Sequence, residues 1–237
     1  MTPRKRGFTL VELNISMAFV AMLLLGIAAL SLHVARLYER GMLLKDVNYI
    51  GREVMSQMRR DIAAADPSQQ LIYEMKTADG QVENGRICLG SVSYVYNSVL
   101  GISKDDEDRL ITQGGEPVAL VRITDTNRSW CTPTAEGSIP VEISSDSFDG
   151  GDASELIERD EFATISVHHI DINLLRAPGT PERLALYNLD VRLGTSNTNA
   201  IDLSTGTCLP PSVSTIDFNT CYVVDYATII RAGGLRL

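Results

Sequence analysis

The sequence lacks the short motifs that mark many enzyme active sites. It contains no glycine-rich phosphate loop, no His-Glu-x-x-His zinc motif and no Gly-x-Ser-x-Gly nucleophile turn. Its four cysteines form no Cys-x-x-Cys pair, and its three histidines leave few ligands for zinc or redox chemistry. These absences predict a protein that is not an enzyme and that needs no cofactor.

Charge and proline are both missing from residues 13–35. These 23 residues contain no Asp, Glu, Lys, Arg or Pro, and they are rich in Leu, Ala and Met. As a helix they span about 35 Å, which is enough to cross a hydrocarbon core of about 30 Å. Arg4, Lys5 and Arg6 lie just before the run. The positive-inside rule therefore places that end in the cytoplasm and the remainder of the chain across the membrane.

Acidic residues dominate the chain after this apolar run. Residues 1–65 carry nine Lys or Arg against five Asp or Glu, whereas residues 66–237 carry 12 against 25. This asymmetry indicates two parts in different surroundings. The acidic part is long enough to bury a core of its own. Because its charge repels phosphate backbones, nucleic acid is not an expected partner.

Glu12 stands at the edge of the apolar run, where a carboxylate is costly. Such a charge costs about 2.5–3.5 kcal/mol at the centre of a membrane helix and less near its edge, unless it is paired. An ordinary signal peptide has a shorter apolar core of about 7–15 residues. Neither that reading nor a plain single-span anchor explains Glu12, which we therefore treat as a candidate functional residue.

The residues around Glu12 resemble a known processing signal. Residues 7–13 read Gly-Phe-Thr-Leu-Val-Glu-Leu after the short basic leader. This segment resembles the class III signal of type IV pilins and of the pseudopilins of type II secretion and competence systems. The chain departs from many family members in one respect, because Ala29 stands near the place where they have a proline in the membrane segment.

The resemblance implies a processing and assembly scheme. Prepilin peptidase, a membrane aspartyl protease, would cut between Gly7 and Phe8 and methylate the new amino terminus of Phe8. Glu12 would then pair with the amino terminus of a neighbouring subunit during assembly, which offsets the cost of burying its charge. The alternative is that Glu12 merely sits among the lipid headgroups. The implied partners are the peptidase, other pilins or pseudopilins that contact the N-terminal helix, and the membrane platform of the assembly machine.

The helical pattern continues beyond the membrane segment with polar residues interleaved. Apolar residues recur at intervals of three, four and seven and define one stripe, and Asp66-Pro67 ends the pattern. The stripe comprises Leu37, Leu44, Val47, Ile50 or Gly51, Val54, Met58 and Ile62. We predict that it packs on the exported domain.

From residue 71 onward the pattern alternates as in strands. Ala185, Tyr187, Leu189, Val191 and Leu193 share one face, which predicts a half-buried antiparallel strand. Between residues 162 and 175 the alternation slips, which predicts a bulge near His168-His169. Residues 223–230 are expected to form a terminal strand or strand pair.

These patterns predict an α+β fold, with a long N-terminal helical spine followed by a C-terminal antiparallel β-sheet domain. The expected divisions are a leader at residues 1–7, a membrane or filament-core helix at 8–35, an amphipathic second half of the spine at 36–66, and an exported β-rich domain at 67–237.

The four cysteines all lie on the exported side, where oxidation is plausible, and they allow three pairings. Cys208 and Cys221 are 13 residues apart, and this spacing resembles the C-terminal disulfide loop of many pilins. The resemblance thus implies a Cys208–Cys221 bridge and leaves Cys88 and Cys131 for a second one, with free buried thiols as the alternative.

Two features offer weaker candidates for metal binding. Asp146, Asp149 and Asp152 lie in an acidic loop that could supply calcium ligands, although the spacing does not match an EF-hand. His168-His169 with Asp171 nearby lacks a third ligand at recognisable spacing. We expect solvated loops and no resident metal.

The size of the distal domain bears on the subtype. The long β-rich region, with residues 87–97 in particular, looks more like the large W-type minor pilins, or the related J-type pseudopilins, than like a compact major pilin. The sequence therefore predicts a minor type IV pilin at the filament tip, which primes assembly. The alternatives are a J-type pseudopilin and a tip adhesin or DNA-uptake receptor. The chain would first be a single-pass protein of the cytoplasmic membrane and then part of an extracellular or periplasmic filament.

Overall fold

The computed structural model describes residues 9–66, 70–77, 79–104, 109–132, 141–143, 153–157, 165–177, 184–210 and 221–233. Contacts divide the chain into two compact units, Met1–Met42 and Leu43–Leu237. Each unit is described below by itself.

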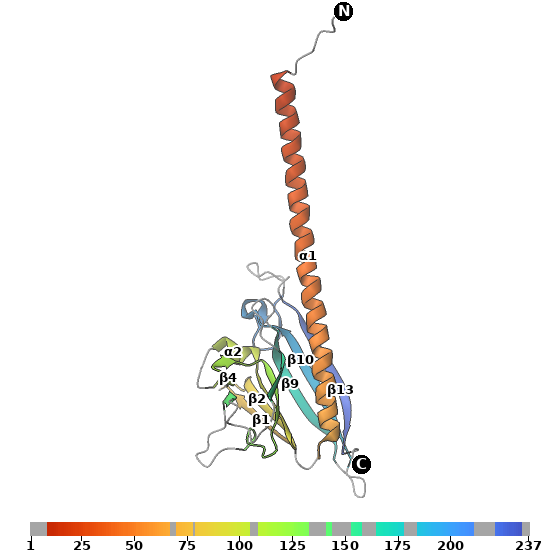
Figure 1. Ribbon diagram of the computed structural model, residues 1–237, viewed down its shortest axis with the longest axis vertical. Coiled ribbons are helices and arrows are strands. Elements are labelled where there is room, and N and C mark those ends of the chain that lie inside the picture. Colours follow the sequence, from red (N-terminus) through yellow and green to blue (C-terminus); the bar gives the residue numbers. More distant parts are fainter. Residues whose placement is uncertain are drawn as a thin grey trace, which may run out of the picture. The chain divides into compact units, whose positions relative to one another are not determined.

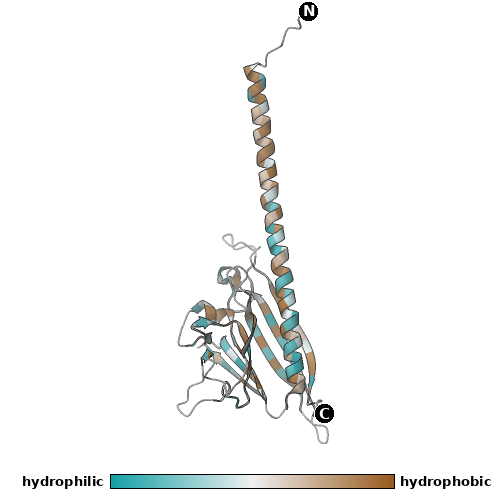
Figure 2. Ribbon diagram, in the orientation of Figure 1, coloured by the Kyte–Doolittle hydropathy of each residue, from teal (hydrophilic) through white to brown (hydrophobic). Residues whose placement is uncertain are grey.

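One long helix, α1, runs from Leu10 to Ala64 and contains 55 residues. Every described residue of the first unit is exposed, including the apolar side chains between Leu10 and Val34. Figure 2 shows that this stretch is predominantly hydrophobic, whereas the later turns of α1 carry more hydrophilic residues. The helix contains a segment long and apolar enough to cross a membrane. The helical spine predicted from the sequence is thus present, with bounds two residues inside the predicted ones.

The second unit contains a five-stranded antiparallel sheet in the spatial order β1-β2-β3-β6-β8. Its strands are β1 (Gln70–Lys76), β2 (Val82–Leu89), β3 (Val92–Asn97), β6 (Leu120–Thr124) and β8 (Ala153–Ile157). A short helix, α2 (Val99–Lys104), follows β3. A small sheet of order β5-β4-β7 is formed by β4 (Thr112–Gln113), β5 (Glu116–Pro117) and β7 (Glu142–Ile143).

A three-stranded antiparallel sheet contains the three longest strands, in the order β13-β10-β9. These strands are β9 (Ile165–Arg176), β10 (Ala185–Thr195) and β13 (Val223–Ala232). Arg192 and Leu193 of β10 pair with His169 and Val167, so His168 is the extra residue of a bulge. The bulge predicted from the slipped alternation is confirmed. Among the described residues between β10 and β13 lie a 3-10 turn, η3 (Thr198–Ala200), and a hairpin of β11 (Ile201–Asp202) and β12 (Thr207–Cys208).

The main core lies between the later turns of α1 and the inner faces of both large sheets. The helix contributes Val47, Gly51, Val54, Met58 and Ile62, which recur every three or four residues. Strand β10 contributes all five of its predicted apolar residues. In Figure 1 this part of α1 lies along β10 and β13. Leu37 and Leu44 belong to the predicted stripe but are exposed, so the packed part of the stripe begins at Val47.

A second core covers the opposite face of the five-stranded sheet. It contains Trp130 together with Cys88 of β2, Val95 of β3, and Val121 and Ile123 of β6. Strand β3 is therefore buried on both faces. Strand β6 contributes to both cores but carries the partly exposed Arg122, as β10 carries the partly exposed Asn188, Asp190 and Arg192.

Candidate functional site

Gly7 and Phe8, the residues at the predicted processing point, lie outside the described residues. The described residues begin with Thr9, directly before the first turn of α1. The backbone N–H and the Oγ1 hydroxyl of Thr9 each donate to Oε2 of Glu12 at 2.9 Å, and the Glu12 N–H donates to Thr9 Oγ1 at 3.3 Å. These reciprocal bonds form a capping box, in which Thr9 is the N-cap and Glu12 the third helical residue.

The capping box gives Glu12 a role within its own chain. A carboxylate in the first turn also interacts favourably with the positive end of the helix dipole. Thr-x-x-Glu at residues 9–12 is a sequence signature of the capping box. The capping role of Glu12 was therefore predictable from the sequence, although the resemblance pointed only to its charge. Any test of intermolecular pairing must therefore separate the charge of Glu12 from its capping bonds.

Asp61 ties the last turns of α1 to the five-stranded sheet. Its Oδ2 accepts from Arg122 Nε at 2.7 Å and from the Tyr94 hydroxyl at 2.5 Å, and its Oδ1 accepts from Arg122 Nη2 at 3.2 Å. Burial acts to raise the pKa of Asp61, but the bonds from Arg122 and Tyr94 outweigh it, so the pKa lies below its ordinary value. This contact fixes the helix on the sheet, and the local sequence pattern gave no sign of it.

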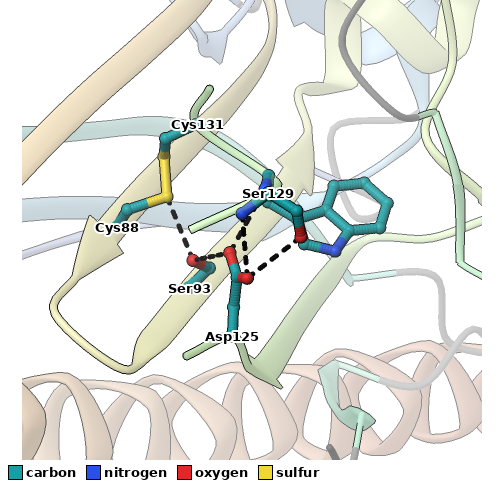
Figure 3. Close-up of a disulfide and its surroundings, with 6 residues drawn as sticks. Cys88, Ser93, Asp125, Ser129 and Cys131 are labelled. Carbon is teal, nitrogen blue, oxygen red and sulfur yellow. Dashed lines mark hydrogen bonds between the residues drawn. A yellow bond between two sulfur atoms is a disulfide. The ribbon is translucent and has the colours of Figure 1, made fainter. Parts of the chain in front are cut away.

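The structure contains a Cys88–Cys131 disulfide, one of the two pairs expected from the sequence, with Cα atoms 6.2 Å apart. Figure 3 shows Asp125 and Ser93 beside it. Asp125 Oδ2 accepts from the Ser93 hydroxyl at 2.8 Å and from the Trp130 N–H at 3.2 Å, and its Oδ1 accepts from Ser129 N at 2.9 Å and Ser129 Oγ at 3.0 Å. Asp125 thus holds the loop that presents Cys131 to Cys88 of β2.

Cys208 and Cys221 form the second expected disulfide, with Cα atoms 5.8 Å apart. It joins the end of the β11–β12 hairpin to the start of β13. By loop length, the 43-residue and 13-residue closures stabilise the fold by roughly 4 and 3 kcal/mol through the entropy of the unfolded chain.

Side chains of the three-stranded sheet hold the turn of the β11–β12 hairpin. Arg192 Nη1 donates to the Thr205 carbonyl at 2.7 Å, and Arg192 Nε pairs with Asp225 Oδ1 at 2.5 Å. The bulged His168 lies with Nδ1 3.0 Å from the Gly206 carbonyl oxygen and Nε2 3.0 Å from that of Thr195. The bulge therefore directs His168 toward the hairpin.

The candidate metal ligands fall only partly within the described residues. Asp146, Asp149 and Asp152 lie outside the described residues. Within the described ranges, no three His, Cys, Asp or Glu side chains gather in an arrangement that could hold a metal ion. Both ring nitrogens of His168 lie 3.0 Å from backbone carbonyl oxygens, Nδ1 from that of Gly206 and Nε2 from that of Thr195, so each faces a protein oxygen.

Comparisons of the chain with protein-family models, curated proteins and solved structures give no match.

Proposed function

We propose that this chain is a minor subunit of a type IV pilus-like filament, stored in the membrane and processed by prepilin peptidase. The observation that carries the proposal is the placement of the Gly-Phe-Thr-Leu-Val-Glu-Leu segment directly at the start of α1. The same helix supplies an apolar stretch long enough to span a membrane and then a stripe that packs on a sheet domain. A subunit that must move from lipid into a filament needs both parts.

The sheet domain is proposed to lie outside the cytoplasm. Both of its disulfides are of a kind that persists in oxidising compartments. The basic residues before the apolar stretch favour the orientation that exports this domain. In this proposal the N-terminal helix contacts sister subunits and the exported domain lies near the filament tip.

The proposal assigns Glu12 to pairing with the amino terminus of a neighbouring subunit. Glu12→Gln tests this role, because glutamine can still complete the capping box with Thr9 but carries no charge. We expect Glu12→Gln to leave membrane insertion and disulfide formation unchanged and to reduce incorporation into sheared filaments strongly, as measured by quantitative immunoblotting.

Thr9→Ala is the matched control. It removes the N-cap side chain, at a cost of about 1 kcal/mol to the start of the helix, and keeps the charge of Glu12. Incorporation should be close to that of the unmodified protein. Normal incorporation of Glu12→Gln, or an equal defect in Thr9→Ala, would contradict a specific role for the charge of Glu12 in assembly.

A further inference from the structure

The two disulfides differ sharply in accessibility. Cys88 is fully buried, Cys131 is 9% exposed, and the neighbouring Ser93 and Trp130 are fully buried. Cys208, by contrast, is exposed at the end of β12, while its partner Cys221 is buried beside Val99, Ala200 and Ile201. A thiolate in solution can therefore approach the second bridge from the side of Cys208, whereas both cysteines of the first bridge are buried residues.

We propose that Cys208 is a site of reversible thiol–disulfide exchange with exported dithiol proteins or small dithiols. A thiolate attacks Cys208 Sγ, the S–S bond breaks, and Cys221 leaves as a thiolate that takes up a proton. The second thiol of the reductant then attacks the mixed disulfide and releases Cys208 as a free thiol. The reductant becomes a disulfide while the protein gains two thiols, so the two-electron exchange balances.

Hydrogen bonds, as well as the disulfide, hold the chain on both sides of the Cys208–Cys221 bridge. On one side, Cys208 pairs with Ile201 in the hairpin, Leu209 N donates to the Ala200 carbonyl at 2.9 Å, and Arg192 holds the turn. On the other side, Thr195 N donates to the Tyr222 carbonyl at 3.0 Å, next to Cys221. None of these contacts involves the S–S bond, so we expect both ends to stay in place when it opens and an oxidant to re-form it.

The Cys88–Cys131 bridge is buried and is held in place by the hydrogen bonds of Asp125. To expose either sulfur, the loop that carries Cys131 must move away from the sheet. That movement breaks the bonds that Asp125 accepts from Ser93, Ser129 and Trp130. One bridge is thus protected from exchange and the other is open to it. This inference does not depend on the proposed function.

Limited reduction of the full-length protein in detergent micelles tests the proposal. Samples taken during exposure to dithiothreitol are alkylated with N-ethylmaleimide and mapped by mass spectrometry without further reduction. We expect alkylation of Cys208 and Cys221 at least about tenfold faster than that of Cys88 and Cys131. Fluorescence of Trp130, the single tryptophan, should stay constant during the first phase, because its surroundings belong to the other bridge. Oxidised glutathione should restore the Cys208–Cys221 bridge.

Two variants and a denatured sample serve as controls. Asp125→Ala should speed reduction of Cys88–Cys131, whereas Asp202→Ala, which removes a partly exposed carboxylate that accepts from Ser204, should leave that rate unchanged. In concentrated urea the unmodified protein should lose the difference between the bridges. Equal rates in the folded protein, faster reduction of Cys88–Cys131, or failure of the opened bridge to re-form would overturn the proposal.

Discussion

At the residue scale, the bulged residue His168 connects β9 to the β11–β12 hairpin. The bulge turns its ring toward the hairpin. Gly194 leaves room for the ring, because a Cβ there would lie 2.9 Å from Nε2 as well as 2.6 Å from the Tyr222 carbonyl oxygen. A neutral imidazole has one N–H, so it donates to either the Gly206 or the Thr195 carbonyl at a time. The protonation state of this ring therefore bears on the stability of the domain.

His168 should make the folded protein sensitive to mild acid. Burial lowers the pKa of His168, and nearby Arg192 lowers it further, while the two carbonyls and Asp225 partly oppose this. Because the folded pKa lies below the unfolded value of 6.5, the unfolded chain binds the proton first, and stability falls as pH decreases through about 6.5. Urea unfolding in micelles should show lower stability at pH 5.5 than at pH 7.5.

His168→Gln should remove most of this pH dependence, and His169→Gln provides the control. His169 is the exposed neighbour of His168 on the same strand, so its replacement should leave the dependence in place. A pH dependence that persists in His168→Gln, or disappears in His169→Gln, would show that another group is responsible.

At the scale of elements, α1 and β13 approach each other closely at Gly51. The Tyr226 ring fills the place where a side chain would stand, and its hydroxyl donates to the Val47 carbonyl at 3.1 Å. Alanine would stabilise the helix itself more than glycine does. Glycine is nevertheless required at residue 51, because the Tyr226 ring of β13 leaves no room for a side chain. Both Gly51 and the apolar stripe therefore position the later turns of α1 on the sheet.

Gly51→Ala should loosen this crossing. The added Cβ would lie 2.2 Å from the Tyr226 ring, so the ring must move and lose its bond to Val47, at a cost of about 1–3 kcal/mol. Gly41→Ala is the matched control, because nothing lies within 4 Å of a Cβ at that helical position. Chemical denaturation should show a loss for Gly51→Ala alone, and equal behaviour of the two variants would contradict the close approach.

The elements also show what local pattern can and cannot predict. Periodicity predicted α1, β10 and the bulge at His168, because each leaves a repeat or a slip in a short window of sequence. It did not predict that β3 is buried on both faces, or that Asp61 would pair with Arg122, because those contacts join residues far apart in the chain. At the candidate site, the capping box of Thr9 and Glu12 could be predicted from their spacing in the sequence. The bonds by which Asp125 holds the Cys131 loop could not, because Ser93 lies far from Asp125 in the chain.

At the scale of the whole molecule, average composition conceals two different parts. The net charge of −9 combines a basic N-terminal region with a strongly acidic domain. The contact pattern likewise separates residues 1–42, whose described side chains are exposed, from a sheet domain with buried cores and two disulfides. An apolar segment long enough to span a membrane, joined to a domain with cores of its own, accounts for both observations.

The central claim is that the chain is a processed, membrane-stored filament subunit, and the N-terminus of the protein purified from its own cells tests it most directly. Intact-mass and N-terminal peptide mass spectrometry should show that residues 1–7 are absent and that Phe8 carries one methyl group on its amino nitrogen. A purified protein that retains Arg4, Lys5, Arg6 and Gly7, or that begins at another residue, would contradict the account.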